Sequence, residues 1–191
     1  MDLKAQLEEA AWGAVEIAHN VKADQLAQPT PCQDWDVRTL ANHLTFWAAF
    51  RSEVAARKQT PPSGSENDID YVTEDWATVF ERQLTKPVAA WAEPGAWDGE
   101  TGLAGGSSPA PVIGKMMIGE LVVHGWDLAR ATGQDLACDG DLADTVYEGV
   151  VMFAEQGREY HIFGEPVEVP DTASVLAKAL ALSGRDPYWS P

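Results

Sequence analysis

The chain has 191 residues, of which 45% are hydrophobic, so it is long enough to fold around its own core and is not intrinsically disordered. Thirteen Lys and Arg residues against thirty Asp and Glu residues give a net charge of −17, which opposes binding to nucleic acid and to anionic membranes. No apolar run approaches the roughly 18 residues of a membrane span. The N-terminus also lacks the basic-then-apolar order of a secretion signal, so we expect a cytoplasmic protein.

Hydrophobic periodicity predicts an all-α chain. Apolar side chains at three- and four-residue spacing mark an amphipathic helix over residues 3–21. A second helix is expected to begin after Asp36, whose carboxylate can cap it, and to extend to about Val54. A third helix is expected over residues 69–84, and Pro87 should end or kink it because proline lacks the backbone donor.

The second half of the chain continues this pattern. Residues 93–111 are rich in glycine and proline, which predicts a long irregular loop of the kind that often walls a functional site. A fourth helix is expected over about 112–131 and a fifth over about 142–155. We therefore predict a four-helix bundle with an extra helix over residues 1–158, and a short C-terminal extended-plus-helix tail, residues 159–191, packed on the bundle.

One predicted helix is apolar almost all round yet carries an acid and a base. Residues 116–127 include Glu120 and His124, whose i, i+4 spacing puts both side chains on one face. A buried carboxylate without a cationic partner is costly, and the nearest basic residues, Lys115 and Arg130, lie toward the helix ends. Either a bound divalent metal or a hydrogen bond between the two side chains would relieve this cost.

The second predicted helix offers a third ligand. His43 is flanked on its helical face by Leu40 and Trp47, which predicts that it also points inward. Two imidazoles and one carboxylate leave coordination positions open, an arrangement typical of a catalytic metal rather than a structural one. A core histidine with satisfied hydrogen bonds is the alternative interpretation of His43.

Other side chains near these positions have two interpretations each. Asp127, three residues after His124, can orient a ligand imidazole or be exposed. Trp47 and Trp126 flank the proposed site and either wall it or belong to the core. Cys32 is a candidate nucleophile, although a small residue packed before a helix is the more common role.

Two motifs resemble the mycothiol-dependent maleylpyruvate isomerase family of DinB-like proteins. Residues 30–37 (TPCQDWDV) with 40–44 (LANHL) are similar to the opening of that family's second helix. Residues 120–129 (ELVVHGWDLA) with 131–133 (ATG) are similar to its second motif. The ending, 184–189 (GRDPYW), is similar to the tail of a shorter metal-binding branch, so the likeness covers nearly the whole chain.

The resemblance implies a DinB-like four-helix bundle that binds a divalent metal through His43, Glu120 and His124. Zinc is the usual metal, with nickel, iron or manganese as alternatives. The resemblance also implies mycothiol, a low-molecular-weight thiol, as cosubstrate. The isomerase carries a further C-terminal domain, for which we expect this chain to be too short.

These expectations combine into a metal-dependent enzyme that uses mycothiol on a small electrophile, as an S-transferase or an isomerase. Asp127 would orient a ligand or contact the thiol, and Trp47 or Trp126 would pack against the substrate. A metal-water hydrolase and a non-catalytic metal-binding protein are the alternatives. The sequence leaves open whether the bundle forms a homodimer.

Overall fold

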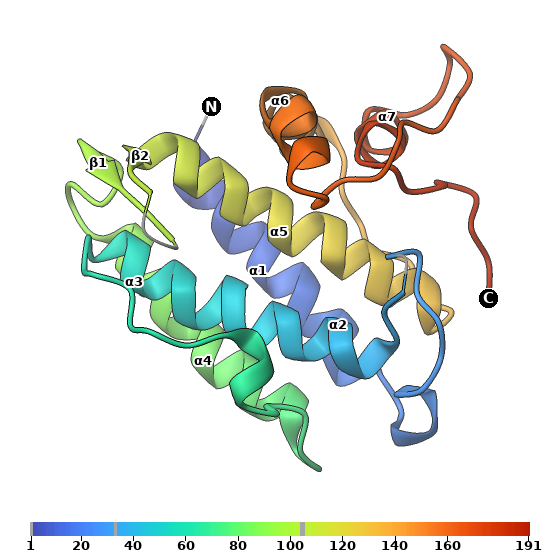
Figure 1. Cartoon of the computed structure of the whole chain (residues 1–191), viewed down its shortest axis with the longest axis horizontal. Coiled ribbons are helices and arrows are strands. Elements are labelled where there is room, and N and C mark those ends of the chain that lie inside the picture. Colours follow the sequence, from blue (N-terminus) through green and yellow to red (C-terminus); the bar gives the residue numbers. More distant parts are fainter. Residues whose placement is uncertain (1, 33, 104–105) are drawn as a thin grey trace.

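A computed structural model describes residues 2–32, 34–103 and 106–191. Over these residues the regular structure is helical apart from one small two-stranded sheet and an isolated bridge, which confirms the predicted all-α class (Figure 1). The main helices are α1 (Leu3–His19), α2 (Val37–Leu44), α3 (Ser52–Ala56), α4 (Trp76–Ala92), α5 (Ala110–Ala131), α6 (Gly140–Glu159) and α7 (Val175–Leu182). The other elements include two short 3₁₀ turns, η1 (Ala23–Gln25) and η3 (Glu66–Asp68), and an antiparallel strand pair, β1 (Glu100–Thr101) and β2 (Ser108–Pro109).

The bundle has four members because α2 and α3 are joined into one rod by a π-helical segment, η2 (Thr45–Arg51). Helix α1 packs against α4 and α5, and the rod packs against the same two helices, so the four enclose a common core (Figure 1). Full burial of one large apolar side chain stabilises a fold by about 1.5–3 kcal/mol. The largest fully buried side chains in the core include Leu40, Leu44, Phe80, Leu84, Trp91, Ile118, Leu121 and Leu128.

The rod begins where the sequence predicted. Asp36 Oδ1 accepts a hydrogen bond from the Thr39 backbone N–H at 2.8 Å, which caps the first turn of α2. The helical stretch then continues through η2 into α3 and ends at Ala56, close to the expected end. The π-helical turns lie directly after α2, and segments of this kind are frequent at functional sites.

The third predicted helix begins later than expected. Helix α4 starts at Trp76, and residues 69–75 lie outside it because hydrogen bonds to α2 hold them in another conformation. The Tyr71 N–H donates to Asn42 Oδ1 at 2.7 Å, and Arg38 Nη2 donates to the Val72 carbonyl at 2.8 Å. These contacts come from residues some thirty positions away, so local periodicity did not reveal them.

Pro87 does not end the third helix, so that part of the prediction was wrong. Helix α4 continues through this residue to Ala92, and Pro87 is buried. A proline inside a helix removes one backbone hydrogen bond to the preceding turn. The apolar ring is buried against the core, and that burial offsets part of the loss.

The C-terminal segment lies beside α6 (Figure 1). Helix α7 packs against α6, and the chain before and after α7 crosses at Gly164 and Gly184. Gly184 has a φ of +88°, and a Cβ built there would lie 2.5 Å from Gly164 Cα, so only glycine fits this crossing. The crossing determines where the next residue, Arg185, enters the interior. None of the helices in the described parts of the chain has the length and apolar character needed to cross a bilayer.

Candidate metal centre

Three side chains converge between α2 and α5. His43 comes from the last turn of α2, and Glu120 and His124 come from successive turns of α5. His43 Nε2 lies 2.8 Å from Glu120 Oε1, and His124 Nε2 lies 3.7 Å from the same oxygen. One potential ligand atom from each residue therefore lies within 4.8 Å of the others. The structure brings together the three residues that the sequence singled out, and Glu120 lies closer to His43 than to its helical neighbour.

The far nitrogen of each imidazole faces another carboxylate. His43 Nδ1 lies 2.6 Å from Glu66 Oε2, and His124 Nδ1 lies 3.0 Å from Asp127 Oδ2. Asp127 is thus buried against His124, as one of the two sequence interpretations required, whereas Glu66 was not predicted. A carboxylate on Nδ1 holds the proton there and leaves the Nε2 lone pair directed at the shared site.

Neighbouring charges in the cluster strongly shift the pKa values of His43 and Glu120. Burial would lower the pKa of His43, but the Glu120 and Glu66 carboxylates outweigh it and raise that pKa to about 9. Burial would raise the pKa of Glu120, but the two imidazoles outweigh it and lower that pKa to about 2. Without an ion, the carboxylate is therefore stabilised by a proton held on imidazole.

The donor set fits a divalent metal. Glu120 Oε1 is buried, and among the described residues it accepts no hydrogen bond of good geometry, even though His43 Nε2 is near. Two imidazole nitrogens and one carboxylate oxygen match the ligands of catalytic zinc, with positions left for water or substrate. Histidine ligands of metals usually donate their other ring N–H to a carboxylate, and Glu66 and Asp127 are placed to accept from His43 and His124 in this way.

A neighbouring group of potential ligands fits a metal less well. Cys32, His124 and Asp127 also offer atoms within 4.8 Å of one another. The guanidinium of Arg185 already occupies that place, because its Nη2 lies 3.2 Å from Asp127 Oδ2 and 3.5 Å from Cys32 Sγ. The positive charge of Arg185 would repel a metal ion bound there. We therefore propose His43, Glu120 and His124 as the metal ligands and do not include Cys32.

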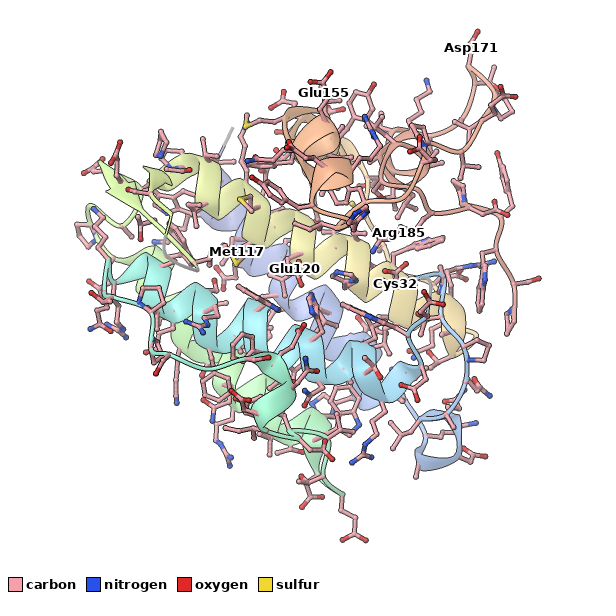
Figure 2. All side chains as sticks on the ribbon, viewed as in Figure 1. Cys32, Met117, Glu120, Glu155, Asp171 and Arg185 are labelled. Carbon is pink, nitrogen blue, oxygen red and sulfur yellow. The ribbon has the colours of Figure 1, made fainter. Side chains whose placement is uncertain are left out.

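Arg185 is the buried cation that the sequence analysis missed. It is 5% exposed, and it pairs with Asp127, which is 0% exposed. Its Nε–H, although buried, donates to no acceptor among the described residues. Figure 2 places Arg185 beside α5, near Cys32 and Glu120. The expectation that no basic residue reaches this helix face was therefore wrong, because the cation comes from the tail.

Cys32 packs as a small residue before α2. Burial dominates its environment and raises the pKa of the thiol to about 12, despite the opposing effect of Arg185. Such a thiol is protonated near neutral pH, which disfavours the nucleophile interpretation.

The tryptophans around the cluster are not the expected pair. Trp35 stacks on the site: its ring centroid lies 4.5 Å from that of His43 and 5.8 Å from that of His124. Trp47 is farther, at 6.3 Å from His43, and its Nε1 donates to Glu66 Oε2 at 3.0 Å. Trp126 is buried in the hydrophobic core and lines none of the cavities at the cluster. A tryptophan two residues after His124 points to a different side of α5, so it cannot share the face of that imidazole.

A mainly apolar cavity of about 380 Å³ opens beside the cluster. Leu103 and Ser108 contribute to it from the predicted 93–111 loop. Its other polar or charged lining residues are Lys115, Glu120, His124, Gln156, Tyr160 and Arg185. Residues 104–105 of that loop lie outside the described residues. Apolar side chains of α5, α6 and the tail form the rest of the wall, namely Ile113, Met116, Val123, Val150, Phe153 and Phe163. The arrangement can hold a small molecule against a metal and a buried cation.

The sequence profile of the mycothiol maleylpyruvate isomerase N-terminal domain matches residues 7–129. The chain belongs to this family. Two uncharacterised relatives, from two strains of Mycobacterium tuberculosis, are each 32% identical to it over 126 residues, or 65% of this chain. The chain spans about 64% of the length of these curated relatives.

Solved structures of the maleylpyruvate isomerase have the same fold. A crystal structure of the mycothiol-dependent maleylpyruvate isomerase matches with a TM-score of 0.67 and 16% identity, over 97% of this chain and 90% of that one. A histidine-to-alanine variant of such an isomerase matches with a TM-score of 0.57 and 17% identity, over 82% and 73% of the two chains. The first match confirms the predicted DinB-like bundle. Because it covers 97% of this chain, the likeness also reaches into residues 159–191.

Proposed function

We propose that this member of the maleylpyruvate isomerase family is a divalent-metal enzyme that uses mycothiol as cosubstrate in an S-transfer or isomerisation of a small electrophile. The observation that carries the proposal is the geometry of the cluster. The Nε2 atoms of His43 and His124 face Glu120, while their Nδ1 atoms face Glu66 and Asp127. Membership of the family supports the choice of the thiol.

His43, Glu120 and His124 would hold the ion, and zinc is the metal that the donor set suits. When bound, the ion would keep the sulfur of the thiol as a thiolate near neutral pH. Asp127 accepts from His124 Nδ1 and so keeps that ring in the tautomer that can bind metal. The apolar wall of the cavity excludes water from the thiolate and strengthens each polar interaction there.

Arg185 would orient the electrophile. Its guanidinium lines the cavity and is positively charged, so it would attract an anionic group such as a carboxylate. The thiolate sulfur would then add to an electrophilic carbon, and the displaced π-electron pair would move to the neighbouring atom. In a transfer reaction this atom takes a proton and the C–S bond remains. In an isomerisation the C–S bond breaks again and the thiol is regenerated.

The test uses the purified full chain loaded with cobalt. Mycothiol should produce a sulfur-to-cobalt charge-transfer band, and elemental analysis should find one metal per chain. The variants His43→Ala and Glu120→Ala should lose both signals. His19→Ala is the matched control, since His19 also contacts a glutamate, at 2.7 Å, but lies at the exposed surface away from the cluster.

Three outcomes would overturn the proposal. Metal content that is unchanged in His43→Ala would show that the ligand assignment is wrong. Hydrolysis of a small substrate without thiol would favour the metal-water hydrolase. A metal-loaded protein that gives neither a sulfur band nor turnover would favour a non-catalytic metal-binding protein.

A further inference from the structure

We infer that Glu66 is a positioning residue of the metal centre: it fixes the ring of His43 so that its Nε2 binds the ion. This inference rests on the proposed metal function of His43. Glu66 Oε2 lies 2.6 Å from His43 Nδ1 and also accepts from Trp47 Nε1 at 3.0 Å. The Glu66 side chain is 27% exposed, so solvent screens this contact only in part.

Two donors of the α2–η2 rod hold the backbone around Glu66 in place. Asn42 Nδ2 donates to the Glu66 carbonyl at 2.8 Å. The Arg51 side chain, which is almost fully buried, donates to the carbonyls of Pro62 and Gly64 at 2.9 Å each. The segment that precedes Glu66 is therefore bound to the helical rod that carries His43.

These contacts place Glu66 by structure that is distant in sequence. The carboxylate is contacted through its Oε2 by residues of α2 and η2, and its backbone is fixed by the residue next to His43. A carboxylate that merely neutralised surface charge would not need two side-chain donors from one rod and a third on its own backbone carbonyl. The arrangement instead matches the outer carboxylate that orients a metal-binding imidazole, and Asp127 has the same relation to His124.

The expected consequence is a change in metal affinity. With Nδ1–H donated to Glu66, the ring of His43 is fixed in orientation and its Nε2 becomes more basic. Loss of such a partner typically weakens metal binding about 10- to 100-fold. We therefore expect Glu66→Ala to raise the dissociation constant for zinc by about 10- to 100-fold. Glu66→Gln, which keeps the volume and one acceptor oxygen, should raise it by less.

Zinc affinity of the full chain is measured by competition with a chromophoric chelator. Glu81→Gln is the matched control, because Glu81 accepts from the exposed His19 at 2.7 Å and should leave zinc affinity unchanged. A second measurement separates positioning from general destabilisation. In the cobalt-loaded protein, NMR detects the exchangeable ring N–H of each ligand histidine. Glu66→Ala should speed solvent exchange of one such proton and leave the one held by Asp127 unchanged.

The outcomes separate this inference from the proposed function. If the wild-type chain binds no zinc in the competition assay, both fall together. If the wild-type chain binds zinc while Glu66→Ala and Glu66→Gln bind it equally well with unchanged ring-proton exchange, the role of Glu66 is overturned and the metal centre stands. Weaker zinc binding with both ring protons exchanging faster would indicate a loosened fold and would also overturn the positioning role.

Discussion

The buried ion pair between Asp127 and Arg185 links the tail to the bundle, and its loss should strongly destabilise the fold. Asp127 is 0% exposed and Arg185 is 5% exposed, with Oδ2 and Nη2 3.2 Å apart. In Arg185→Met the apolar stem is largely retained, but among the described residues the Asp127 carboxylate then keeps His124 as its one side-chain partner. Breaking a buried pair in this way costs about 3–5 kcal/mol, a large part of the about 5–15 kcal/mol that typically stabilises a domain.

At about 2–4 °C per kcal/mol for a chain of this size, Arg185→Met should lower the Tm by about 6–20 °C. Urea unfolding of the metal-free protein at pH 7, followed by circular dichroism, gives the free energy directly. Asp127→Asn and the double variant complete a cycle in which the double variant should cost less than the sum of the single ones. Arg57→Met is the control, since Arg57 makes only a surface i, i+4 pair worth about 0.2–0.5 kcal/mol. A loss below about 1 kcal/mol for Arg185→Met, typical of a surface pair, would refute the reasoning.

Three further predictions concern single positions. Without metal, the free energy of unfolding should fall as the pH rises from 6.5 to about 9, because folding raises the pKa of His43 from the first value to the second. The stability that protonated His43 contributes is fully present below pH 6.5 and is lost as the pH passes about 9. Urea unfolding with a chelator present measures this free energy, and a rise over the interval would contradict the assignment. Gly184→Ala should cost about 1–3 kcal/mol or more, because its φ is +88° and the new Cβ would meet Gly164; an unchanged thermal midpoint would show that the crossing can relax. Trp126→Phe should leave zinc affinity unchanged in the chelator competition, since the side chain lies in the core. A tenfold loss of affinity would show that Trp126 does contribute to the metal site.

The centre of the candidate site was predictable because its signals are local. Glu120 and His124 are one helical turn apart in an apolar segment, and His43 lies among apolar neighbours on a capped helix. Helical periodicity alone turns such residues toward the interior. Periodicity did not predict that the two helices bring these three residues together. That prediction came from the resemblance of the motifs to the family.

The surroundings of the site were not predictable in this way. Glu66 lies in a short turn and Arg185 follows a glycine in the tail, and neither segment has a hydrophobic period. Their places depend on contacts between residues far apart in the chain, such as Asn42 with Glu66 and Asp127 with Arg185. The late start of α4 has the same cause, because side chains of α2 bind the backbone ahead of it.

The π-helical segment η2 has a consequence for how the chain tolerates changes in length. A π turn accommodates one more residue than an α turn, and each residue advances a helix by about 100°. Deleting one residue within Thr45–Arg51 can therefore be absorbed by closing a π turn to an α turn, which keeps the phase of α3 relative to His43. A deletion in an α-helical stretch of the bundle has no such reserve and would rotate the residues that follow by about 100°. The buried face of α3, which includes Ala55, should consequently keep its place in the bundle after a one-residue deletion in η2.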